Sequence, residues 1–188
     1  MRYLIIILFV VMVIAQWFVP LSMIVGQENV LTDGKVFKFR TAPIDPSDPF
    51  RGKYITLQFR ESTFPVDTSL HLTPNEVIYV TVDEDTDGFA VIKTVSQEIP
   101  VNTEDYVTAK AGFMFNDSLL NIRYPFEQFY MEESKASEAE RAYWDANRDS
   151  TQIAFALVAV RNGKTALKDV IVNGKSVRDL VDEMNKEK

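Results

Sequence analysis

Residues 3–25 read YLIIILFVVMVIAQWFVPLSMIV and contain no charged side chain. A helix needs about 20 mostly apolar residues to cross a bilayer, and this stretch reaches that length. The residues that follow are polar, acidic and rich in the alternating patterns typical of strands. The sequence therefore predicts an N-terminal transmembrane anchor over residues 1–25 and one β-rich domain over residues 26–188.

A cleaved signal peptide is the main alternative to an anchor. The small residue Ala15 ends a Val-Ile-Ala triplet of the kind that a signal peptidase accepts, after an apolar run of suitable length. However, the apolar stretch continues from Trp17 to Val25. Cleavage at Ala15 would leave this stretch at the start of a mature chain, so the sequence favours an uncleaved anchor.

Charge sets the expected orientation and limits the partners. Arg2 precedes the apolar stretch, whereas Glu28 and Asp33 are the first charges after it, which favours a cytoplasmic N-terminus and a domain outside. Without Arg2 the domain holds 19 Lys and Arg against 27 Asp and Glu, a net charge of −8. Such a domain disfavours nucleic acid and anionic lipid as direct partners.

The residue inventory argues against the usual cofactor sites. The chain has no cysteine, one histidine and seven glycines, without a glycine-rich phosphate loop. The Asp-x-Asp-x-Asp-Gly run of residues 83–88 resembles the start of an EF-hand loop, but the twelfth position is Thr94 where a bidentate glutamate is required. We therefore expect a hairpin turn at 83–88 and no metal, nucleotide or redox cofactor.

The domain reads as mostly β. Alternating apolar and polar residues predict strands at 36–40 and 53–60, and turn signals predict hairpins that join 76–82 to 89–95, 106–115 to 119–124, and 153–160 to 165–172. The last hairpin carries Asn162-Gly163, the strongest two-residue hairpin signal. Capping residues Ser137 and Ser176 predict two short helices. The expected fold is a mostly β (α+β) domain, an antiparallel sheet of barrel-like form with two short helices, preceded by one transmembrane helix.

Residues 45–59 read DPSDPFRGKYITLQF. This stretch resembles the signature of the GDYXXLXY protein family, in which a DP-x-DP run leads into RGDY-x-x-L-x-Y after an N-terminal membrane segment. Here Lys53 replaces the family aspartate and Phe59 the last tyrosine. Two further stretches are similar to the family, IRYPFEQFY at 122–130 and IVNG at 171–174.

The resemblance implies a location and an association. The family is bacterial, has no assigned activity and tends to be found alongside multi-pass membrane proteins. It implies a single-pass protein of the bacterial membrane with its domain on the periplasmic side. The expected function is a binding or assembly module that acts with another membrane or envelope protein.

Two stretches supply the candidate binding residues, which mix arginine, acid and tyrosine. These types hold carboxylates or a partner's charged side chains. The alternative for the first stretch is architecture, since Asp-Pro units pre-set turns and an Arg–Asp pair would lock the loop. The candidates are Asp48, Arg51, Tyr54, Arg123, Tyr124 and Glu127.

No catalytic set is evident in the sequence. A serine hydrolase similar to membrane-anchored signal peptidases would have to use Ser22, which lies inside the apolar stretch without a lysine in a matching motif. An unrecognised envelope enzyme of this kind and a small-ligand sensor remain as alternatives to the binding module.

Overall fold

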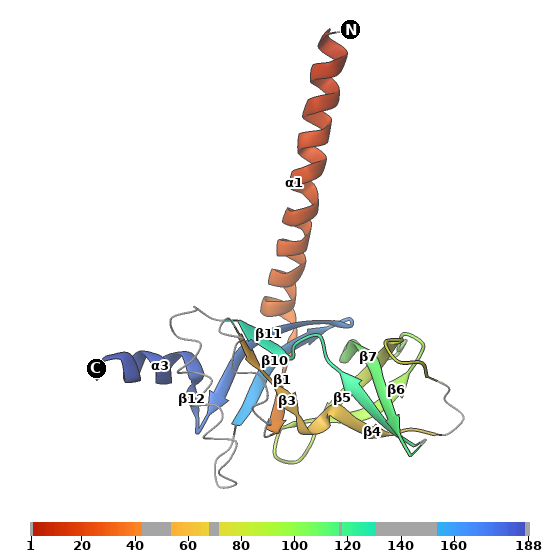
Figure 1. Ribbon diagram of the computed structural model, residues 1–188, viewed down its shortest axis with the longest axis vertical. Coiled ribbons are helices and arrows are strands. Elements are labelled where there is room, and N and C mark those ends of the chain that lie inside the picture. The colour runs from red at the N-terminus through yellow and green to blue at the C-terminus, as the bar shows by residue number, and fades with distance from the viewer. Residues whose placement is uncertain (1, 43–53, 68–71, 117, 131–153, 187–188) are drawn as a thin grey trace.

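The computed structural model describes residues 2–42, 54–67, 72–116, 118–130 and 154–186. One long helix, α1, rises from a group of β-strands that lie across its foot (Figure 1). The strands form two five-stranded sheets and one two-stranded sheet, and every strand pair in them is antiparallel.

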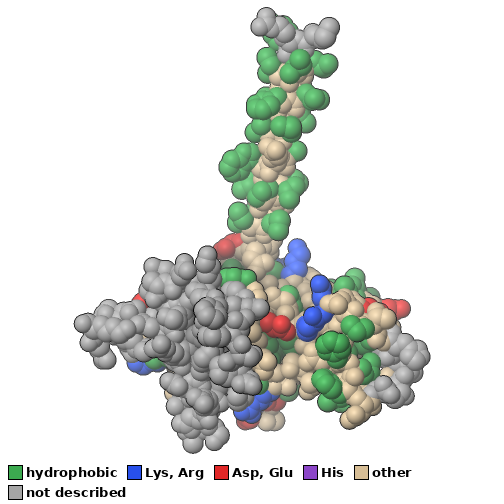
Figure 2. Space-filling view, in the orientation of Figure 1, with side chains coloured by type: hydrophobic (Ala, Val, Ile, Leu, Met, Phe, Trp, Pro, Cys, Tyr) green, Lys and Arg blue, Asp and Glu red, His purple; other side chains and the backbone are tan. Residues whose placement is uncertain are grey.

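Helix α1 spans Arg2–Asp33 and includes Pro20. Large apolar side chains between Tyr3 and Val25 are exposed along the helix (Figure 2), and their positions in the sequence distribute them around it. A helix that is apolar all round suits a lipid environment. The expected membrane-length helix is thus confirmed by length and composition. However, the helix does not end with the apolar stretch, because it continues from Gly26 to Asp33.

The last turns of α1 pack on the domain. Val30 is buried against Ala159 and Ala166, which are cross-strand partners in one sheet. Small alanine side chains let the helix approach the strands closely. Gly34 ends the helix, and its amide donates to the carbonyl of Val30 at 3.0 Å.

Polar contacts fix the same turns of α1. Arg161 Nη1 lies 2.7 Å from Oδ2 of Asp33, and Lys168 Nζ donates to the carbonyl of Leu31 at 3.1 Å. A cation on the last carbonyls is the favourable arrangement for a helix C-terminus. The helix and the domain are therefore joined by side-chain contacts as well as by the chain itself.

The first sheet carries the foot of α1. Its order is β12 (Lys175–Ser176), β11 (Lys164–Val172), β10 (Ala154–Arg161), β1 (Lys35–Ala42) and β3 (Gln58–Phe59). The predicted Asn-Gly hairpin joins β10 to β11, with Asn162 and Gly163 at φ of 49° and 79°. This hairpin prediction is confirmed.

The second sheet contains the other predicted hairpins. Its order is β4 (Thr63–Pro65), β8 (Leu119–Arg123), β7 (Tyr106–Phe115), β5 (Val77–Glu84) and β6 (Ala90–Ser96). The β5–β6 and β7–β8 hairpins are both confirmed. The expected turn between β5 and β6 is found, but it is shorter than 83–88, because Asp83 and Glu84 end β5 and pair with β6, and residues 85–88 form the turn.

The predicted strand at 53–60 is divided in the structure. It becomes β2 (Tyr54–Thr56), which pairs with β9 (Gln128–Tyr130), and β3, which pairs with β1. The division falls at Leu57, whose amide donates to the carbonyl of Glu127 at 2.7 Å. The predicted alternation of buried and exposed side chains is present, since Leu57 and Phe59 are buried while Thr56 and Gln58 are exposed. The prediction of one continuous strand over 53–60 was therefore wrong, because the chain pairs with β9 before Leu57 and with β1 after it. A short 3₁₀ turn, η1 (Arg60–Ser62), leads on to β4.

One hydrophobic core joins the sheets. Within it, Phe39, Phe59, Tyr124 and Phe126 form an aromatic cluster with ring centroids 5.0–5.9 Å apart. The sheets also meet through the backbone of Gly163, which exchanges hydrogen bonds with Tyr106 and Thr108 of β7.

The C-terminal helix is confirmed as α3 (Val177–Lys186). The Ser176 hydroxyl accepts from the amide of Arg178 at 3.2 Å, and Val177 is buried in the core. The helix predicted to follow Ser137 lies outside the described residues. The mostly β, antiparallel and barrel-like fold class is confirmed, with one sheet nearly closed on itself.

Candidate functional site

The strands bring the two motif stretches together. Strand β2 is part of the first motif and lies antiparallel to β9, which ends the second motif, so that Tyr54 is the partner of Tyr130. Asp48 and Arg51 lie outside the described residues, and Tyr54 is placed by its backbone alone. Arg123, Tyr124 and Glu127 are described in full. The predicted association of the motifs is therefore present at the level of strand pairing.

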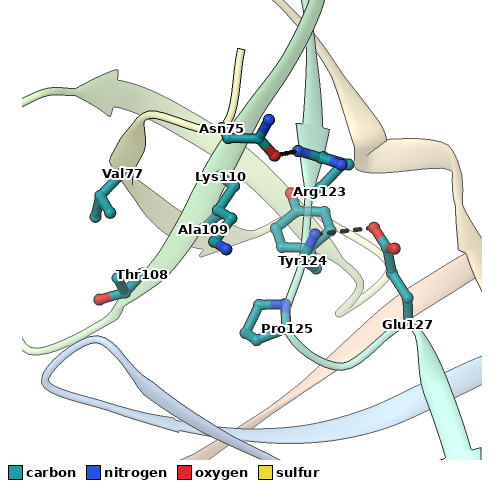
Figure 3. Close-up of a pocket in the computed structure, with 9 residues that line it drawn as sticks. All are labelled: Asn75, Val77, Thr108, Ala109, Lys110, Arg123, Tyr124, Pro125 and Glu127. Atoms are coloured by element: carbon teal, nitrogen blue, oxygen red, sulfur yellow. Dashed lines mark hydrogen bonds between the residues drawn. The ribbon is translucent and has the colours of Figure 1, made fainter. Parts of the chain in front are cut away.

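A cleft of about 410 Å³ opens beside the second motif (Figure 3). Strands β5, β7 and β8 and the turn before β9 surround it, together with the turn that precedes β5. Its lining residues are Asn75, Val77, Thr108, Ala109, Lys110, Arg123, Tyr124, Pro125 and Glu127. Three of the predicted site residues thus share one cleft.

Two basic side chains lie next to each other in this cleft. Lys110 on β7 and Arg123 on β8 are direct cross-strand partners, and both are exposed. Like charges directly opposite each other across a strand pair are destabilising. Asn75 accepts a hydrogen bond from the Arg123 guanidinium through its Oδ1 (Figure 3). This contact orients the guanidinium, and no carboxylate of the described residues pairs with Lys110.

Glu127 is the acidic residue of the cleft. Its Oε1 accepts from the amide of Tyr124 at 3.0 Å, which closes the turn between β8 and β9. Partial burial raises the pKa of this carboxyl, although the Tyr124 amide and the Arg123 charge both act to lower it. Glu127 and Arg123 also line a second cavity of about 300 Å³ between β3 and β8. Arg123 and Glu127 therefore line both the cleft and the second cavity.

Tyr124 belongs to the core. It is 4% exposed, its ring stacks on Phe126 at 5.0 Å, and its hydroxyl donates to the carbonyl of Glu61 at 2.7 Å. Burial raises the pKa of this hydroxyl far above its usual range, with the nearby Glu61 and Glu127 carboxyls contributing. The ring thus positions the turn that links Arg123 to Glu127, and it offers little surface to a partner.

The chemistry of the cleft suits an anionic group. Lys110 and Arg123 both line the cleft and carry N–H donors, and the guanidinium can bind a carboxylate or phosphate through two parallel hydrogen bonds. Among the residues that the structure describes, no group of three or more His, Asp or Glu side chains is placed to hold a metal ion.

Comparison with known protein families identifies the family of this chain. Residues 16–170 match the family described as GDYXXLXY protein. The chain belongs to the GDYXXLXY family. The signature leucine of this GDYXXLXY protein is Leu57, where the strand changes partners, and the position of its last tyrosine is the buried Phe59. No curated protein and no solved structure matches the chain.

Sequence reasoning missed Lys110 and Asn75. Lys110 stands between two buried alanines in an alternating strand, which is the ordinary pattern of a solvated face. Its position opposite Arg123 depends on a register that includes a bulge between Ala111 and Met114. Asn75 follows Pro74 and adopts a positive φ of 73°, which a Pro-Asn pair signals as a turn without indicating what the amide binds.

Proposed function

We propose that this GDYXXLXY protein is a membrane-anchored binding and assembly module that acts with a multi-pass membrane protein. The single observation that carries the proposal is the cross-strand pair of Lys110 and Arg123 in the cleft beside the family motif. Two adjacent cations in a cleft recognise an acidic side chain or a chain-terminal carboxylate of the partner. Arg123, Glu127 and the strand that begins at Tyr54 are the described part of the proposed surface. Asp48 and Arg51, which lie outside the described residues, are proposed as further members of it.

The anchor supports a partner within the same membrane. A domain held at the bilayer surface meets its membrane neighbours at a high effective concentration, so a modest contact area is enough for stable association. Arginine is also among the residue types that most often dominate interface energies.

The domain acts outside the cytoplasm in this proposal. Arg2 precedes the apolar stretch, and acidic residues follow it. Protease treatment of spheroplasts tests the side. Digestion of the domain in intact spheroplasts supports the proposal, whereas a domain that is protected until the cells are lysed contradicts it.

Photo-crosslinking in cells tests the binding surface. A photoreactive residue replaces Val77, which is 47% exposed and lines the cleft without carrying its charge. We expect one specific crosslinked membrane protein, lost when Lys110→Gln and Arg123→Gln are combined in the same chain. A second photoreactive residue at Arg51 tests whether the first motif reaches the same partner.

The matched control is Lys93→Gln combined with Lys38→Gln, which removes the same charge from exposed strand positions away from the cleft. Crosslinking that survives the cleft variants, or that is lost equally in the control, would contradict the proposed surface. Circular dichroism and thermal unfolding of each variant establish that the domain is folded.

A small-ligand sensor is the second candidate function. The cleft volume of about 410 Å³ falls within the range of small-molecule sites, roughly 300–1,000 Å³. Thermal shift of the full chain in detergent with small dicarboxylates distinguishes the two. Stabilisation by such a ligand that Lys110→Gln abolishes, without any crosslinked protein, would favour the sensor.

An envelope hydrolase has less support. Ser22 lies in α1, where its hydroxyl donates to the carbonyl of Val19 at 2.7 Å. A serine nucleophile needs a general base within hydrogen-bond reach. The hydrogen bond that Ser22 makes is instead the ordinary back-bond of a helical serine.

A further inference from the structure

A second basic site lies at the foot of α1. A cavity of about 310 Å³ separates the helix from the β10–β11 turn, and Gly26, Asn29, Val30, Arg161, Asn162 and Lys164 line it. It belongs to the first sheet and shares no residue with the cleft beside the family motif. We propose that this cavity binds the phosphate of an anionic membrane lipid.

The height of the cavity relative to the bilayer follows from the helix. Gly26 is the residue directly after the uncharged stretch, and at about 1.5 Å of rise per residue Asn29 lies about 4.5 Å further along the axis. The polar headgroup layer is about 5–8 Å thick on each side of the hydrocarbon core. When α1 spans the bilayer, the cavity therefore lies at headgroup level, where the phosphates of the surrounding lipids are found.

Lys164 supplies an unpaired cation at this level. A Cβ built on Gly26 would lie 3.7 Å from Nζ of Lys164, so the ammonium is held against the helix backbone. None of the carboxylates in the described parts of the chain pairs with it. Lysine side chains at membrane interfaces place their ammonium groups among the headgroups in this way.

Arg161 completes the basic wall of the cavity. One of its nitrogens binds Asp33, which neutralises that carboxylate and fixes the guanidinium beside the helix. A guanidinium has five N–H donors, so others remain for a phosphate oxygen. Asn29 and Asn162 add side-chain amides, which also donate to phosphate.

The arrangement of charge around α1 favours an anion on this side. Gly26, Asn29, Val30 and Asp33 share one helix face by their spacing, whereas Glu28 falls on the opposite face. Figure 2 shows basic side chains on one side of the foot of the helix and an acidic side chain on the other, while Asp33 on the cavity face is paired with Arg161. The acidic domain thus has a local basic contact where it meets the bilayer.

Native mass spectrometry of the full chain in detergent tests the proposal with three probes. These are phosphatidylglycerol, phosphatidylcholine with the same acyl chains, and inorganic phosphate. We expect one phosphatidylglycerol per chain, with binding at least fivefold weaker for phosphatidylcholine and not detectable for inorganic phosphate. Lys164→Gln should weaken phosphatidylglycerol binding about fivefold, the effect of one basic residue near an anionic surface.

Two variants provide controls. Lys164→Arg keeps a cation at the site and should retain binding, while Lys93→Gln removes an exposed cation from β6 and should bind as the wild type does. Phosphatidylglycerol binding that is unchanged in Lys164→Gln would overturn the site. Equal binding of phosphatidylcholine, or comparable binding of inorganic phosphate lost in the same variant, would overturn its assignment to an anionic lipid.

The inference rests on the membrane attachment of α1 and not on the protein partner. Carbonate extraction of membranes tests separately whether α1 is inserted in the bilayer. Loss of the crosslinked partner therefore leaves this proposal standing, and loss of lipid binding leaves the partner proposal standing.

Discussion

Arg40 Nη2 lies 2.7 Å from Oδ2 of Asp85, and this ion pair joins β1 of the first sheet to the β5–β6 turn of the second. The Arg40 guanidinium also stacks over the ring of Phe89 at 4.1 Å. The other oxygen of Asp85 accepts from the amides of Asp87 and Phe89 at 2.9 and 2.8 Å. Asp85 therefore links the acidic turn to the other sheet, a role that the sequence pattern alone did not distinguish from those of its neighbours.

Asp85 should make the stability of the domain depend on acid pH. The Phe89 amide and the Arg40 charge lower the pKa of this carboxyl below its usual value of 3.8. An acid with a lowered pKa in the folded state stabilises above its unfolded pKa, and the effect is lost as the pH falls through the folded value. We expect Asp85→Asn to lower the melting temperature at pH 6 and to reduce its decline below about pH 4. The measurement is thermal unfolding from pH 2.5 to 7.

Asp87→Asn is the control for this prediction, since Asp87 is 75% exposed and lies 3.7 Å from the same guanidinium. It should leave most of the acid-dependent decline in place. Equal behaviour of both variants would show that the turn acts only through its total charge.

Glu127 should change the pH dependence of stability in the opposite direction to Asp85. Burial raises the pKa of this carboxyl above its usual value of 4.5. Its ionisation is therefore harder in the folded state, and the stability present below pH 4.5 decreases as the pH rises through the folded pKa. Glu127→Gln stays neutral and keeps an oxygen for the Tyr124 amide. We expect it to raise the melting temperature at pH 7 and to match the wild type near pH 4.

Gly163 should tolerate alanine less well than Gly174 does. Both follow an asparagine in a tight turn, with φ of 79° and 80°, so the backbone cost of a Cβ is the same, about 1–2 kcal/mol. At Gly163 the added Cβ would lie 2.5 Å from Oγ1 of Thr108 and 2.7 Å from Cε2 of Tyr106, whereas at Gly174 it would meet nothing within 4 Å. We expect Gly163→Ala to cost about 1–3 kcal/mol more than Gly174→Ala in urea unfolding. Equal costs would mean that the two sheets do not meet as closely at this turn.

The hydroxyl of Tyr124 should contribute to stability rather than to partner contact. Tyr124→Phe removes the hydrogen bond to the Glu61 carbonyl and keeps the ring, at a cost of about 1 kcal/mol. Tyr79→Phe is the matched control, because the structure gives the Tyr79 hydroxyl no hydrogen bond within the described residues, and it should change stability by less than about 0.5 kcal/mol. Crosslinking from Val77 should persist in both variants. Its loss in Tyr124→Phe alone would place the hydroxyl in the contact with the partner.

Local patterns in the sequence predicted most of the fold. The Asn162-Gly163 turn and the alternation along β1 depend on neighbouring residues only, and both are found in the structure. The change of partners at Leu57 could not be predicted in this way, because it depends on the carbonyl of Glu127, seventy residues further along the chain. The continuation of α1 past Val25 was missed for a similar reason, since the small pair Ala159 and Ala166 stabilises its last turns.

In the candidate site too, the sequence predicted the residues of a local motif and missed those that only the strand pairing brings together. Arg123 and Glu127 were predicted from a motif and share one cleft. Lys110 was not predicted, because a single lysine in an alternating strand is typical of a solvated face and only the strand register places it opposite Arg123. A cross-strand pair of like charges is a property of the sheet rather than of either segment.

The uncleaved anchor is the prediction on which the cellular location depends. The uncharged stretch runs past Ala15 to Val25, and the helix that contains it continues into contacts of Asp33 with Arg161 and of Leu31 with Lys168. We expect the protein to stay in the membrane fraction after carbonate extraction, with an intact mass that includes the whole apolar stretch. Asp33→Asn should leave both results unchanged, because the ion pair at the foot of the helix orients the domain and does not hold it in the bilayer. A mature chain that begins at Gln16 would instead identify the stretch as a cleaved signal peptide. The lipid site at Gly26 would then lose its place at headgroup level.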